Sequence, residues 1–157
     1  MIDKETFNKI IMDRVEVLKK RYGFSNQTPY TKLLLNTLAI NLLDEIENYN
    51  EDAIYPFDKD TLEALKTKNY VGFALCYANL DIDRELESSV NFDVVLANIN
   101  CYRDVSAILK TRKKEKPLLI ENSDKYHLKE YLTNVWNLVY CEAWKQLLAP
   151  LQNYLLD

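Results

Sequence analysis

The strongest helix signal in the chain is TPYTKLLLNTLAINLLDEIENY, residues 28–49. Thr28 can cap a helix, and Pro29 suits the first helical position, where its missing N–H costs nothing. The apolar residues that follow recur at three- and four-residue spacing, so this stretch predicts a helix with one buried face. Leu33 and Ile40 lie off that stripe and are expected to be exposed or to contact another helix. The stripe itself consists of Leu35, Leu38, Ala39, Leu42, Leu43, Ile46 and Tyr49.

The segments on either side of this helix carry equally clear signals. Residues 4–21 have the same apolar spacing and predict an amphipathic helix, for which Gly23 provides a C-terminal stop. Residues 50–59, NEDAIYPFDK, predict a connector, because Pro56 disfavours helical backbone at the residue before it. A short connector of this kind suits two neighbouring antiparallel helices.

A further helical stretch begins after the connector. Asp60 and Glu63 resemble a capping pair at its start. Asn69 and Gly72 weaken its middle, so we expect two short helices in place of one. Asp81 then starts another stretch with apolar residues in helical phase.

The C-terminal third predicts two more helices, over residues 92–109 and 124–148. In the second of these, two neighbouring rows of positions spaced by four residues are apolar, so its apolar arc is wider than one contact face. This long helix is therefore either the central helix of a bundle or a helix that presents a second face to a partner. Pro150 is expected to kink or end it.

Length and composition indicate one soluble domain. The chain has 157 residues, of which 48% are hydrophobic and 28% charged, and it contains two Gly and four Pro. Few turn formers and no strand-like alternation favour an all-α fold, which we predict as a single domain over residues 1–157, a bundle of five to seven helices with a long C-terminal helix. No apolar run approaches the roughly 18 residues that span a bilayer, and no signal-peptide stretch is evident, so we expect a cytoplasmic protein without membrane contact.

Few residues have the chemistry of catalysis or metal binding. The three cysteines form no CxxC pair, and His127 is the single histidine, so neither a zinc site nor a disulfide framework is predicted. No nucleophile has an evident base, and glycine-rich phosphate loops do not occur. We therefore expect no cofactor and favour a non-enzymatic role.

Carboxylates are the one group of side chains in the sequence that is typical of an enzyme. Asp44 and Glu47 share a helix face, as do Asp60 and Glu63, and two such pairs on antiparallel helices could hold Mg²⁺ through oxygen ligands. This pattern resembles the paired acidic motifs of the all-α nucleotide pyrophosphohydrolases (the MazG and dimeric dUTPase type). The resemblance implies a magnesium-dependent nucleotide hydrolase. These acids lie on the polar side of their stripe, however, and solvated helix faces with a capping pair explain the same residues.

Basic residues are concentrated in residues 110–116, which carry a charge of +4, whereas the remainder of the chain carries −8. Such a tract could contact nucleic-acid phosphates or an acidic protein, and it is equally typical of a cationic helix end. Nucleic-acid binding through this tract is an alternative hypothesis. The cations concerned are Lys110, Arg112, Lys113, Lys114 and Lys116.

Aromatic residues point to a different function. The chain holds eleven Tyr and two Trp, more than one small core requires, and these residue types dominate binding hot spots. The favoured hypothesis is a non-enzymatic protein-binding module (an inhibitor, adaptor or assembly component) that binds a protein partner or self-associates. Abundant Asn and Lys are typical of AT-rich genomes, such as those of phages or mobile elements in low-GC bacteria. The residues predicted for the contact patch are Tyr126, Tyr131, Tyr140 and Trp144.

Overall fold

The computed structural model describes residues 1–21, 29–87, 136–137 and 140–155. Within these ranges every regular element is a helix, so the predicted all-α class is confirmed. The predicted helix over residues 92–109 and most of the first half of the predicted C-terminal helix lie outside the described residues. The elements are α1 (Lys4–Arg21), α2 (Pro29–Glu47), α3 (Lys59–Lys66), α4 (Tyr70–Glu87) and the 3-10 helix η2 (Ala149–Tyr154), with residues 136–137 and 140–148 also helical.

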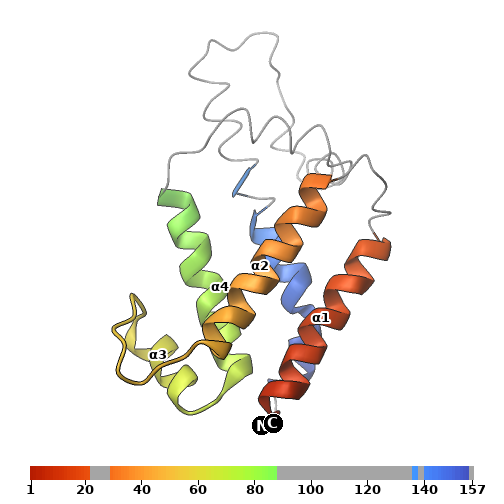
Figure 1. The fold of residues 1–157 in the computed structure, drawn as a ribbon. Coiled ribbons are helices and arrows are strands. Elements are labelled where there is room, and N and C mark those ends of the chain that lie inside the picture. Colours follow the sequence, from red (N-terminus) through yellow and green to blue (C-terminus); the bar gives the residue numbers. More distant parts are fainter. Residues whose placement is uncertain (22–28, 88–135, 138–139, 156–157) are drawn as a thin grey trace.

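Helices α1, α2 and α4 and the helical residues 140–148 lie lengthwise against one another, and the short α3 packs on α4 (Figure 1). One apolar core runs between them, to which each of these segments contributes fully buried side chains. Burying each large apolar side chain is worth roughly 1.5–3 kcal/mol, which offsets the loss of chain entropy. Its large, fully buried side chains include Phe7, Ile11, Leu38, Leu42, Phe73, Trp144 and Leu147.

The two N-terminal helices agree with the sequence pattern. Helix α1 spans the predicted residues, and the apolar stripe of α2 faces the core as expected. Ile40, which lies off that stripe, is 52% exposed. Five stripe residues of α2 are at most 5% exposed, namely Leu35, Leu38, Ala39, Leu42 and Ile46.

The start of α3 differs from the prediction. Asp58, and not Asp60, caps this helix, because its Oδ1 accepts a 2.8 Å hydrogen bond from the backbone N–H of Thr61. The predicted division into two helices is confirmed. Lys68 adopts a left-handed backbone conformation with φ of 60° between α3 and α4, and the side chain of Asn69 then accepts a hydrogen bond from the N–H of Gly72 at the start of α4.

Helix α4 continues through Asp81 to Glu87, so the helix start predicted at Asp81 is wrong. The side chain of Asp81 accepts hydrogen bonds from another helical segment instead of capping its own helix. A short polar side chain favours a helix start only where it faces free backbone N–H groups. Such groups are absent in the middle of a continuous helix.

The end of the described chain docks onto the bundle. Pro150 lies in the first turn of η2, so the expected end of the α-helix at this proline is confirmed. Leu151 is fully buried, and the guanidinium Nε of Arg14 in α1 donates a 2.7 Å hydrogen bond to the backbone oxygen of Gln146. The last carbonyls of a helix have no partner within it, so this bond both satisfies one of them and ties α1 to the C-terminal helical segment. No helix in the described part of the chain is long and apolar enough to cross a bilayer.

Candidate functional site

Two residues predicted for a protein-contact patch lie in the apolar core between the described helices. Tyr140 is 8% exposed and Trp144 is 1% exposed. The indole of Trp144 meets the ring of Tyr77 edge to face, with ring centroids 5.9 Å apart. The apolar side chains of residues 140–148 are buried or half-buried, which fits the central-helix alternative for this part of the chain. The contact role of Tyr140 and Trp144 stays a prediction, and in this arrangement both present little surface to a partner.

The other predicted binding residues lie outside the described part of the chain, so the geometry of the basic tract and of half the aromatic patch is not described. They are Tyr126, Tyr131, Lys110, Arg112, Lys113, Lys114 and Lys116.

Two carboxylates of α4 hold the aromatic side chains of the C-terminal segment in place. Asp81 accepts one hydrogen bond from the hydroxyl of Tyr140 and another, of 2.9 Å, from the indole N–H of Trp144. One helical turn further on, Glu85 accepts a 2.8 Å bond from the indole N–H of Trp136. Buried tyrosine and tryptophan side chains need partners for their polar atoms, and these carboxylates provide them. The cluster therefore docks two helical segments against each other.

The electrostatics of this cluster suit a structural role. Burial raises the pKa of the Tyr140 hydroxyl, and the hydrogen bond to Asp81 raises it further. Burial, followed by the nearby negative charge of Asp81, raises the pKa of Tyr77 to about 12. General acids and bases work best with a pKa near the operating pH. Both phenols are instead held in their neutral form, as hydrogen-bond donors or core side chains.

The acidic pairs do not form a metal centre in the described structure. Glu47 forms an ion pair with Lys4, with 2.7 Å between its Oε2 and the lysine Nζ. Asp44, Asp60 and Glu63 are exposed. Within the described ranges, no three His, Cys, Asp or Glu side chains form a group that could hold a metal ion. The magnesium-dependent reading therefore gains no support from this part of the chain.

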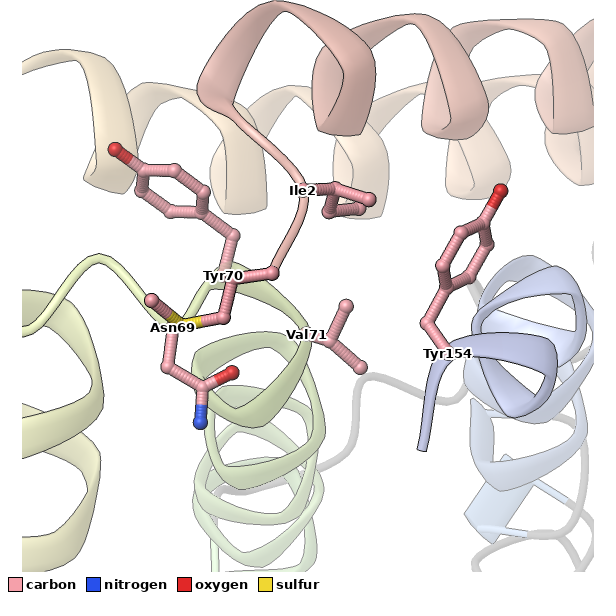
Figure 2. Close-up of a pocket in the computed structure, with 6 residues that line it drawn as sticks. Ile2, Asn69, Tyr70, Val71 and Tyr154 are labelled. Carbon is pink, nitrogen blue, oxygen red and sulfur yellow. The ribbon is translucent and has the colours of Figure 1, made fainter. Parts of the chain in front are cut away.

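A small pocket lies where residues 1–2 and Tyr154 meet the start of α4 (Figure 2). Its volume is about 220 Å³, below the roughly 300–1,000 Å³ of typical ligand pockets. Figure 2 shows Tyr70 and Tyr154 on opposite sides, with Ile2 and Val71 between them. No charged side chain lines it.

The loop between α2 and α3, residues 48–58 (the α2–α3 loop), has a different character. Ile54 in this loop is 100% exposed, and its neighbours Ala53 and Pro56 are exposed as well. A single exposed apolar side chain is common on protein surfaces. What distinguishes Ile54 is the way in which the loop around it is braced.

Hydrogen bonds close the α2–α3 loop on itself. The backbone N–H of Asn50 donates a 2.8 Å bond to the hydroxyl of Tyr55, across the loop. The side-chain oxygen of Asn50 accepts from the N–H of Asp52 at 3.0 Å, and its backbone oxygen accepts from the N–H of Ala53 at 3.1 Å. These bonds brace the backbone before Ile54 and the side chain of Tyr55 after it.

Stacked aromatic rings connect the same loop to the core. Tyr55 stacks between Tyr49 and Phe57, with centroid distances of 5.9 and 5.4 Å. Phe57 in turn meets Phe73 of α4 at 5.8 Å in an edge-to-face arrangement. Such aromatic pairs contribute roughly 0.5–1.5 kcal/mol each beyond their buried area. The loop is thus held in one conformation by contacts within the chain.

Sequence reasoning missed this loop, because it assigned residues 50–59 to a connector and no function to Ile54. The available signal was an aliphatic residue set between acidic residues and a run of aromatics. The exposure of Ile54 depends on the path of the loop, which the sequence pattern does not define.

Comparison with known proteins adds no functional assignment. No protein-family model, curated protein or solved structure matches the chain. The function has to be inferred from the geometry of the described residues.

Proposed function

We propose that the protein is a non-enzymatic protein-binding module, an inhibitor, adaptor or assembly component, that contacts its partner through the α2–α3 loop. The observation that carries this proposal is the complete exposure of Ile54 on a loop braced by hydrogen bonds and stacked rings. A preorganised loop loses little entropy on binding. Burying one isoleucine side chain in a partner adds roughly 1.5–3 kcal/mol.

The chemistry of the described residues supports the non-enzymatic part of the proposal. Asp81 and Glu85, the carboxylates that accept bonds from buried side chains, serve to dock the C-terminal segment. No charged side chain lines the pocket beside Tyr70. A binding surface, in contrast, needs an exposed anchor on a stable support, which the α2–α3 loop offers.

The test is a selection of random displayed peptides on the immobilised full-length chain. The selected peptides are then measured against two variants, Ile54→Asp and the matched control Ile40→Asp, which alters an exposed isoleucine on α2. We expect Ile54→Asp to weaken binding by roughly tenfold or more, since a buried isoleucine is worth that much. We expect Ile40→Asp to leave binding unchanged, and circular dichroism checks that both variants fold.

Two outcomes would contradict the proposal. One is the absence of any enriched peptide, and the other is a set of peptides that bind the two variants and the wild-type chain with equal affinity.

A further inference from the structure

The charges around Ile54 are almost all of one sign. Residues 44–63 contain eight acidic residues and a single basic one, Lys59. Glu51 and Asp52, which precede Ile54 in the α2–α3 loop, are exposed and have no ion-pair partner among the described residues. The exposed isoleucine thus follows two exposed acidic residues in a segment of strongly negative net charge.

Helix stability does not explain the acids at the end of α2. Asp44, Glu45 and Glu47 occupy the end of α2, where the helix dipole disfavours negative charge, and no basic residue lies in the last turn. Burial raises the pKa of Glu45 by more than the positive charge of Arg84 in α4 lowers it, and the neighbouring Asp44 raises it further. Glu47 is offset by Lys4, but Asp44 is exposed and has no such partner among the described residues. Residues that oppose local stability are expected where they serve binding.

We infer that the partner of the α2–α3 loop is a protein segment rich in lysine or arginine, with an apolar recess that receives Ile54. The inference rests on the proposed function and specifies the chemistry of the partner. Opposite charges steer the encounter and fix its register, while the isoleucine supplies the apolar anchor.

The same charges argue against two other occupants. In a symmetric dimer built on this face, each copy would set its acidic residues against those of the other, because such an interface uses the same patch twice. Nucleic acid is disfavoured for the same reason, since its phosphates would meet carboxylates.

The experiment determines the amino-acid composition of the peptides selected on the wild-type chain and measures how their affinity depends on salt concentration. We expect an excess of Lys and Arg around one or two apolar residues, and affinity that falls as salt is raised. The double variant Glu51→Gln/Asp52→Asn should weaken these peptides several-fold. The matched control Asp83→Asn/Glu87→Gln removes the same charge from exposed positions near the C-terminal end of α4, far from the loop in Figure 1, and should leave binding unchanged.

The possible failures separate the two proposals. Peptides whose binding depends on Ile54 but which are neutral or acidic would refute the basic partner. So would peptides whose affinity changes equally in both double variants. Neither result would contradict the proposed role of the α2–α3 loop in binding. Peptides that do not depend on Ile54, or no peptides at all, would refute the proposed function and this inference with it. Measuring the wild-type chain by light scattering adds a check, since a dimer that Ile54→Asp dissociates would overturn the argument against a second copy.

Discussion

Asp81 accepts hydrogen bonds from two aromatic side chains that lie about sixty residues further along the chain, Tyr140 and Trp144. Both donors are nearly inaccessible to solvent. Water therefore cannot readily replace the carboxylate as their acceptor, and an unpaired buried donor costs free energy. At the scale of single residues, this carboxylate links the C-terminal segment to α4.

We predict that Asp81→Ala is strongly destabilising, because it leaves the hydroxyl of Tyr140 and the indole N–H of Trp144 without an acceptor. Each orphaned donor costs roughly 1–3 kcal/mol in the free energy of unfolding. Asp83→Ala, an exposed position two residues along α4, should change it by no more than about 0.5 kcal/mol. Urea unfolding measures both variants. Equal losses for Asp81→Ala and Asp83→Ala would show that the cluster does not stabilise the fold.

We also predict a loss of stability at alkaline pH. The pKa of Tyr77 is raised from 10.0 to about 12 in the folded chain, and that of Tyr140 is raised as well. A raised pKa means that the neutral phenol is favoured by folding, so the stabilisation is complete below pH 10 and is lost as the pH rises towards 12. Melting temperature against pH, together with tyrosinate absorbance, measures this loss. In Tyr77→Phe the loss should be smaller, and an unchanged profile would contradict the assignment to Tyr77.

At the scale of the secondary-structure elements, the sequence predicts buried helix faces well and local polar contacts poorly. The buried stripe of α2 can be predicted because helical periodicity alone sets which residues share a face. The capping residue of α3 cannot be predicted in this way, since Asp58 and Asp60 are both good caps. Only the path of the backbone shows which of the two accepts from the N–H of Thr61. The role of Asp81 was missed for a related reason, because its partners lie far along the chain.

The candidate site was less predictable than the fold. Tyr140 and Trp144 were expected at a contact surface because aromatic residues are enriched there, but tryptophan and tyrosine fill cores equally well when an acceptor is at hand. Ile54 was passed over because a connector gives no periodicity from which exposure can be inferred. A surface formed by a loop depends on tertiary contacts such as the Tyr55 hydroxyl bond.

The bracing of the α2–α3 loop leads to a prediction for that element. Tyr55→Phe removes the hydroxyl that accepts from the N–H of Asn50 and keeps the aromatic stack. A net hydrogen bond is worth roughly 0.5–1.5 kcal/mol, so the amide of Asn50 should exchange its hydrogen about two- to tenfold faster. Hydrogen exchange followed by nuclear magnetic resonance measures this rate. Tyr154→Phe is the control, and an unchanged rate at Asn50 in Tyr55→Phe would contradict the bracing role of the hydroxyl.

At the scale of the whole molecule, the described structure is held together by contacts between the two ends of the chain. Core residues of α1 pack in the same cluster as Leu147 and Leu151 near the other end. Bringing residues so distant in sequence together costs chain entropy, and such non-local contacts are associated with slower folding. The α2–α3 loop is attached to this same core through Phe57 and Phe73.

The final prediction concerns a contact between these two ends of the chain. Arg14→Leu removes the 2.7 Å hydrogen bond to the backbone oxygen of Gln146. This carbonyl at the end of the helix then has lost the side-chain donor of that bond. A hydrogen bond from a charged group is worth roughly 1.5–3 kcal/mol, and each kcal/mol shifts the melting temperature of a domain of this size by roughly 2–4 °C. We therefore expect a fall of about 3–12 °C in a thermal unfolding scan. Lys20→Leu, at an exposed position on the same helix, should change the melting temperature little. Equal melting temperatures for the two variants would show that the bond between α1 and the C-terminal segment does not stabilise the fold. The attachment of that segment would then rest on the packing of Leu147 and Leu151.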